Sequence, residues 1–252
     1  MTEVQGFSPS ASELETQEAR IATGRVELPA YWAKPAGADN CPIILIAQEI
    51  FGLNDHIRDI ARRFAALGYL AIAPDFFAGV GDPSSAPDIT AIRAILAKVP
   101  DAATMEDFDA ALAFASKRGG DPARAAITGF CWGGRIAWLY AAHNSSLRAA
   151  IPWYGRLDGD RTPNHPRWPF DIAGELKVPT LGLYGGADPS IPLTQVEEMR
   201  ARLLASGAPA EIHVYDGAPH AFFADYRESF RPEPARDAWE RTLAFLRAQG
   251  VV

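Results

Sequence analysis

A cysteine framed by two glycines is the residue of this chain best suited to nucleophilic chemistry. Residues 125–135 read AAITGFCWGGR, with Gly129 and Gly133 two positions on either side of Cys131. The apolar run before this pattern predicts a strand and the small residues after it predict a helix, which is the context of a nucleophile elbow. The glycines remove Cβ atoms that would clash at such a turn, and the start of a helix stabilises a thiolate. The frame favours a nucleophile over a buried structural thiol, which is the interpretation that fits Cys41.

A thiol nucleophile also needs a base and an orienting acid, in the chain order nucleophile, acid, histidine. Asp188, in YGGADPSIP, and His220, in YDGAPHAFF, each follow an expected strand. We expect His220 to take the thiol proton and Asp188 to fix the imidazole tautomer. The alternatives are an Asp188 that only forms a turn and an acid supplied by Asp216. Solvated or core roles fit the remaining histidines better: His56, His143, His165 and His213.

Alternating strands and helices are expected to position these side chains. Short apolar runs predict strands at Ile43–Gln48, Tyr69–Ala73, Ala125–Thr128, Ala149–Trp153, Thr180–Tyr184 and Glu211–Tyr215. Between them, apolar residues at helical spacing predict helices, the first with Asn54 as its cap and with Ile57, Ile60, Phe64 and Leu67 on one face. This alternation is typical of an α/β fold, with a mostly parallel sheet flanked by helices.

The N-terminal part of the chain has a different pattern. Arg20–Thr23 and Val26–Lys34 predict an antiparallel hairpin at the edge of the sheet. Residues 1–17 are polar and aperiodic, so we assign them to an arm and residues 18–252 to one domain. The Pro-rich stretch Thr162–Phe170 is too short for a lid domain and is expected to be a loop.

Composition excludes several classes of function. The 252 residues carry a net charge of −7, which disfavours partners that need a basic face, nucleic acid and anionic membranes. Residues 1–20 hold four glutamates and no apolar run, unlike a secretory signal, and no apolar stretch approaches the length of a membrane span. Two cysteines are too few for a disulfide scaffold. We expect a soluble, cytoplasmic protein, with a monomer favoured.

Four segments together resemble the dienelactone hydrolase (carboxymethylenebutenolidase) family of the α/β-hydrolase superfamily. They are IAQEIFG, GFCWGG, GGADPSIP and GAPHAFF, and the resemblance extends from about Val26 to Leu246. It implies a catalytic triad of Cys131, Asp188 and His220, and a thiol-activating role for Glu49. It also implies an oxyanion hole formed by the backbone N–H groups of Ile50 and Trp132. The implied reaction is the hydrolysis of an enol-lactone through an acyl-thioester, without a metal or an organic cofactor.

The arginines that bind the substrate carboxylate in this family are the point at which the sequence departs from it. The family arginine four residues after the catalytic histidine is replaced by Ala224, and Arg227 is the nearest substitute. A second family arginine follows the segment matched by Pro74–Phe76, and its candidate counterpart is Arg93. The catalytic residues therefore match the family better than the residues expected to bind substrate do.

Two classes of function remain to be compared. The first is a thiol hydrolase that acts on a small-molecule lactone or ester. The second is a non-catalytic relative that binds a ligand or responds to oxidants through Cys131, and the presence of both Asp188 and His220 argues against it. A zinc hydrolase is a weaker third reading, because the chain has no HExxH motif and no clustered ligands, and no metal is expected.

Overall fold

The structure is a computed structural model that describes residues 14–252. Helices and strands alternate along most of this range, in the order β1 (Leu14–Ala22), β2 (Glu27–Pro35), β3 (Cys41–Ala47), α1 (Asp55–Ala66), β4 (Leu70–Pro74), the 3₁₀ turn η2 (Pro83–Ser85), α2 (Ile89–Leu96), α3 (Asp101–Ser116), β5 (Gly120–Phe130), α4 (Trp132–His143), β6 (Ala149–Trp153), α5 (Pro169–Ile172), β7 (Thr180–Gly185), α6 (Leu193–Ser206), β8 (Ala210–Tyr215) and α7 (Pro232–Ala248). No helix in this range is long and apolar enough to cross a membrane.

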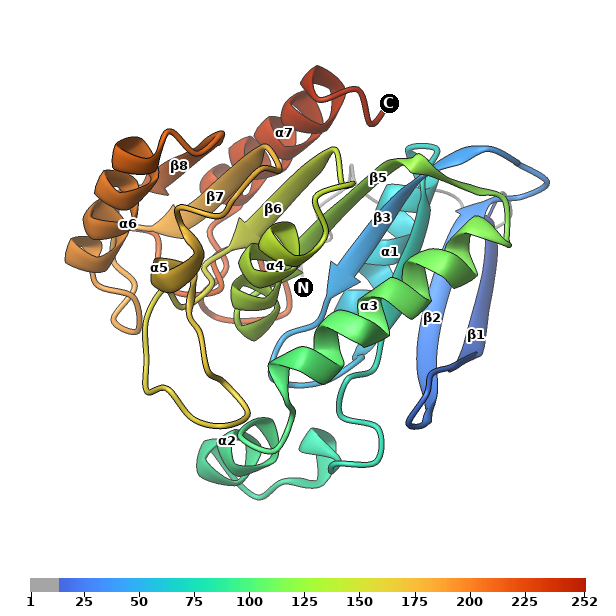
Figure 1. The fold of residues 1–252 in the computed structure, drawn as a ribbon, viewed down its shortest axis with the longest axis horizontal. Coiled ribbons are helices and arrows are strands. Elements are labelled where there is room, and N and C mark those ends of the chain that lie inside the picture. Colours follow the sequence, from blue (N-terminus) through green and yellow to red (C-terminus); the bar gives the residue numbers. More distant parts are fainter. Residues whose placement is uncertain (1–13) are drawn as a thin grey trace.

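The strands of residues 14–252 form one sheet in the order β1-β2-β4-β3-β5-β6-β7-β8. The β1–β2 and β2–β4 pairs are antiparallel, and the pairs from β4 to β8 are parallel. Helices α3 and α4 lie in front of the sheet in Figure 1, and α1 and α7 lie behind it. Because both faces are covered, β3 and β4 are buried at every position. The predicted α/β fold with its mostly parallel sheet is confirmed.

The predicted N-terminal hairpin is present, but its first strand is longer than expected. Strand β1 begins at Leu14, so residues 14–17, which we assigned to the arm, pair with β2 instead. Their mixed polarity conceals the strand because an edge strand is only half covered, and most of its residues are exposed or half-buried. The rest of the predicted arm lies outside the described residues.

Helix α1 has the N-terminal cap and most of the buried apolar face that the sequence predicts. The Asn54 side chain caps it by accepting the backbone N–H of Ile57 at 3.0 Å. Ile57, Ile60 and Phe64 are buried as predicted, whereas Leu67 is 45% exposed. Leu67 is the C-cap residue, so it lies beyond the last turn of the helix and does not continue its buried apolar face.

The carboxyl ends of the parallel strands meet at one edge of the sheet. Five residues with chemically useful side chains follow β3, β5, β6, β7 and β8 in turn, namely Glu49, Cys131, Tyr154, Asp188 and His220. This edge is where open α/β sheets bind ligands.

Candidate active site

The backbone at Cys131 is strained. Cys131 joins β5 to α4 with φ 57° and ψ −115°, a conformation that residues other than glycine rarely adopt. Its N–H donates to the carbonyl of Trp153 at 3.1 Å, which ties the turn to the neighbouring strand β6. The half-buried thiol therefore stands at the junction of β5 and α4, as the glycine frame predicts.

The two framing glycines are required by close backbone packing. A Cβ atom at Gly129 would lie 2.1 Å from the carbonyl oxygen of Gly133, and one at Gly133 would lie 2.2 Å from that of Ala47. No side chain fits at these distances. The first turn of α4 is thus pressed directly against the ends of β5 and β3, which holds Cys131 beside the residues that follow β3.

The structure brings Asp188 and His220 into direct contact. The ring Nδ1 of His220 lies 2.6 Å from Asp188 Oδ2, and because a carboxylate only accepts, we assign the proton to Nδ1. The other carboxylate oxygen accepts the backbone N–H of Ser190 at 2.7 Å. The Asp188 side chain is almost fully buried. The acid is therefore fixed from both sides and in turn fixes the ring.

The thiol is the second partner of His220. Burial lowers the pKa of His220, but hydrogen bonds to Asp188 and to the Cys131 side chain outweigh it and raise this pKa to about 10. The imidazole is thus held in a site that favours its charged form, with an acid on one side and the thiol on the other.

Glu49 is fully buried at the same edge. Its Oε2 accepts the hydroxyl proton of Tyr226 at 2.9 Å, whereas Oε1 has no hydrogen-bond partner among residues 14–252. A buried carboxylate with one free oxygen is costly to maintain unless a ligand or solvent satisfies it.

Tyr154 follows β6 at the same edge of the sheet. The residue is fully buried with φ 36°, and its ring meets that of His220 edge to face at 5.2 Å between centroids. Burial raises the pKa of its hydroxyl well above the usual value, and the nearby Glu49 and Cys131 raise it further. Within the described part of the chain the hydroxyl has no hydrogen-bond partner.

The two residues predicted to form an oxyanion hole lie on either side of the elbow. Trp132 is the first residue of α4, a position whose N–H has no carbonyl partner within a helix. Ile50 follows Glu49 and is half-buried. Their backbone positions are compatible with the predicted role.

The two predicted substrate arginines differ in their placement. Arg227 is half-buried, and its guanidinium carbon lies 5.3 Å from the ring centroid of Phe51. It also acts electrostatically on the hydroxyls of Tyr154 and Tyr226. Arg93 is exposed on α2, and no contact in the described chain joins it to the other candidates. Only Arg227 is brought to the site.

An ion-pair latch, formed by Asp225, His56 and Arg63, holds the loop that carries Tyr226 and Arg227. Asp225 lies 3.3 Å from the ring Nδ1 of His56 and also pairs with Arg63, both on α1. Burial raises the pKa of Asp225, but the hydrogen bonds to His56 and Arg63 outweigh it and hold this pKa well below the usual value. The latch therefore holds Asp225 against α1, and Asp225 directly precedes Tyr226, which contacts Glu49.

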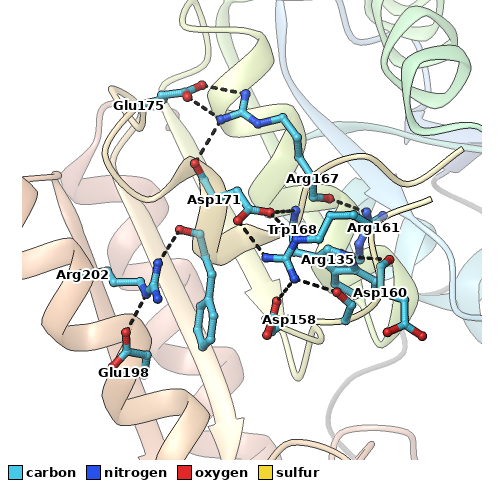
Figure 2. A network of polar contacts seen from close by, with 12 residues as sticks. Arg135, Asp158, Asp160, Arg161, Arg167, Trp168, Asp171, Glu175, Glu198 and Arg202 are labelled. Atoms are coloured by element: carbon cyan, nitrogen blue, oxygen red, sulfur yellow. Dashed lines mark hydrogen bonds and ion pairs between the residues drawn. The ribbon is translucent and has the colours of Figure 1, made fainter. Parts of the chain in front are cut away.

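A second polar cluster, the Arg135 cluster, lies one helical turn beyond Cys131. The Arg135 guanidinium binds both carboxylate oxygens of Asp101 at 2.6 and 2.7 Å and the carbonyl of Arg167 at 2.7 Å, and it lies 4.3 Å from the ring centroid of Trp168. Figure 2 shows that the ion pairs of Arg161 with Asp158 and Asp171 lie next to Arg135 in the same polar network. The cluster fastens the loop after β6 to the nucleophile helix.

No group of three or more His, Cys, Asp or Glu side chains in residues 14–252 is arranged to hold a metal ion. Two further residues at the site, Tyr154 and Tyr226, were not predicted from the sequence. Tyr154 directly follows a predicted strand, so the rule that ligands bind at the carboxyl ends of strands would have found it. No local signal marks Tyr226, because its contact with Glu49 spans 177 positions of sequence.

The chain is similar to known proteins along most of its length. Residues 28–250 match the model of the Dienelactone hydrolase family. An Escherichia coli K12 protein named "Putative carboxymethylenebutenolidase" is 48% identical, over 99% of this chain and 97% of its own length. A Bradyrhizobium protein named "Probable 2-oxo-3-(5-oxofuran-2-ylidene)propanoate lactonase" is 32% identical, over 86% of this chain and 88% of its own. The crystal structure of a "Putative Dienelactone Hydrolase" from Klebsiella pneumoniae has a TM-score of 0.91 and 49% identity, covering 92% of this chain and 98% of that one.

Proposed function

The chain is a hydrolase of the dienelactone hydrolase family, and on this premise we propose that it opens a small lactone or ester with Cys131 as its nucleophile. The observation that carries the proposal is the contact series from Asp188 through His220 to Cys131 at a strained elbow. A site that only binds a ligand would not need a buried carboxylate, Asp188, to orient His220. The same series argues against the non-catalytic alternative.

In the first half of the reaction Sγ attacks the carbonyl carbon of the substrate as a thiolate, while its proton is held by His220 as an imidazolium. Glu49 assists in drawing off this proton, and the N–H groups of Ile50 and Trp132 stabilise the oxyanion. The C–O bond then breaks, and His220 returns its proton to the leaving oxygen. The product of this half is an acyl-thioester on Cys131.

In the second half a water molecule attacks the thioester carbonyl. His220 accepts one proton of the water, with Asp188 stabilising the imidazolium that forms. The C–S bond breaks, and the thiolate leaves with the electron pair. The free acid is released and the thiol is restored by the proton from His220, so atoms and charges balance over the cycle.

Arg227 is our candidate for the residue that recognises a carboxylate on the substrate. It is the arginine brought to the site, and it projects from the same loop as His220 and Tyr226. The Bradyrhizobium relative is named for a lactone that bears a propanoate group, and a substrate of that class would offer such a carboxylate. A higher kcat/KM for a carboxylated lactone than for its uncharged analogue would support this assignment.

Substitution of the nucleophile tests the proposal. We expect Cys131→Ala to lower the hydrolysis of an activated ester such as p-nitrophenyl acetate by on the order of 10⁴-fold or more, because the covalent route is lost. Steady-state rates and the unfolding transition should both be measured. The matched control is Cys41→Ala, which removes a buried thiol outside the site and is expected to retain activity. Turnover retained by Cys131→Ala would overturn the thiol mechanism.

A further inference from the structure

Two buried polar atoms of opposite hydrogen-bonding character lie unpaired at the edge of the sheet that carries the thiol. Glu49 Oε1 is an acceptor and the Tyr154 hydroxyl is a donor, and neither has a hydrogen-bond partner among the described residues. Both side chains are fully buried. Buried polar groups are almost always paired with protein atoms or with ordered water, so this arrangement calls for a group that can bind both.

The surroundings define what these two atoms can do. Tyr226 already donates to Oε2 of Glu49, which leaves Oε1 as the oxygen available to a ligand. Glu49 and Cys131 act on the Tyr154 hydroxyl and, with burial, raise its pKa well above the usual value. Tyr154 therefore keeps its proton throughout the working pH range and serves as a hydrogen-bond donor.

The position of the Tyr154 ring adds a third neighbour. It packs edge to face against the imidazole of His220, with 5.2 Å between the centroids. Because Glu49 and Cys131 both act electrostatically on the Tyr154 hydroxyl, a small ligand that binds Glu49 and Tyr154 would lie near both the nucleophile and the base that serves it. A hydroxyl compound fits because it can donate to a carboxylate and accept from a phenol at the same time.

We propose that Glu49 and Tyr154 hold the water molecule that hydrolyses the acyl-thioester on Cys131. This inference rests on the proposed function. The water accepts a hydrogen bond from Tyr154 and donates one to Glu49 Oε1, and its other proton passes to His220 as its oxygen attacks the thioester carbon. The C–S bond then breaks, with the electron pair leaving on sulfur. Tyr154 itself neither gains nor loses a proton.

The experiment separates acylation from deacylation in Tyr154→Phe. With p-nitrophenyl acetate in a stopped-flow instrument, we expect the burst rate, which reports acylation, to stay within about twofold of the wild type. The steady-state rate should fall by about 10-fold to 100-fold because the attacking water is misplaced. Intact-mass spectrometry of quenched samples should show an acetyl adduct that accumulates on Cys131.

Tyr69→Phe is the matched control. The Tyr69 hydroxyl is also buried without a hydrogen-bond partner in the described chain, but its ring packs against Phe64 of α1. We expect no adduct and unchanged kinetics from this variant. Burst and steady-state rates that fall together in Tyr154→Phe, or that are both unchanged, would overturn the water site. If the Cys131→Ala variant keeps its turnover, the thioester mechanism fails first and the water site fails with it.

Discussion

Two buried polar clusters lie one helical turn apart along the nucleophile segment, and they differ in which atoms are left unpaired. In the Arg135 cluster both guanidinium Nη atoms bind oxygen acceptors and both carboxylate oxygens of Asp101 are used, whereas Arg135 Nε has no hydrogen-bond partner among the described residues. At the edge of the sheet that carries Cys131, a carboxylate oxygen, Glu49 Oε1, and the Tyr154 hydroxyl are left without protein partners.

The difference separates a structural role from a functional one. A buried charge is stable only when it is paired and hydrogen-bonded. Asp101 meets that condition with protein atoms alone, because both of its carboxylate oxygens accept from Arg135. Glu49 meets it at Oε2 only, so its Oε1 is able to accept a hydrogen bond from a group that arrives from solvent. Burial of polar residues therefore does not locate a site, whereas incomplete pairing at a strained nucleophile does.

Removal of one partner from the Arg135 cluster should have the largest effect on stability. We expect Asp101→Ala to lower the free energy of unfolding by about 3–5 kcal/mol, because it leaves the Arg135 charge buried and unpaired. Urea unfolding measures this loss. Arg161→Ala is the control, since it breaks only exposed ion pairs with Asp158 and Asp171 and should cost less than about 1 kcal/mol. Equal losses in the two variants would contradict the distinction.

The pH dependence of the free energy of unfolding should report on His220, which lies beside Cys131. The pKa of His220 is raised from 6.5 to about 10 in the folded protein, so its contribution is fully present below pH 6.5 and is lost as the pH rises toward 10. We expect the free energy of unfolding to fall by on the order of 3 kcal/mol from pH 7 to pH 10.

A His220→Asn variant isolates this contribution, because all other titrating groups are common to both proteins. Its unfolding free energy, measured by urea at the same pH values, should fall less steeply over this interval. Parallel curves for the two proteins would show that His220 does not gain its proton affinity on folding.

The elements that carry the chemistry could be predicted from sequence because their signals are local. The glycine frame of Cys131 reflects clashes between residues four positions apart, and the apolar runs mark strands that helices cover on both faces. The order nucleophile, acid, histidine follows from the order of the strands themselves. The predicted first strand started at Arg20, six residues after the observed start of β1 at Leu14, because an edge strand has no continuous apolar face.

The support around Glu49 could not be predicted, because it depends on contacts between segments that are distant in sequence. Tyr226 meets Glu49 only through the docking of its loop on α1, where Asp225 pairs with His56 and Arg63. Each of these residues alone resembles an ordinary surface charge or a helix-end histidine. The family pattern gave no help here either, since it predicts an arginine where the chain has Ala224.

The smallest effect we predict comes from Tyr226→Phe, which removes the hydrogen bond to Glu49 Oε2 and leaves both carboxylate oxygens of Glu49 without a partner among the described side chains. The variant keeps the ring that packs 4.9 Å from the His56 ring but removes the hydroxyl that binds Glu49 Oε2. We expect kcat to fall about tenfold with KM little changed, about 1.4 kcal/mol, because the carboxylate loses its fixed orientation. The free energy of unfolding should change by about 1 kcal/mol or less, since Tyr226 is 53% exposed. A rise in KM with kcat unchanged would instead place Tyr226 among the groups that bind substrate, and Glu49 would then be oriented by other residues.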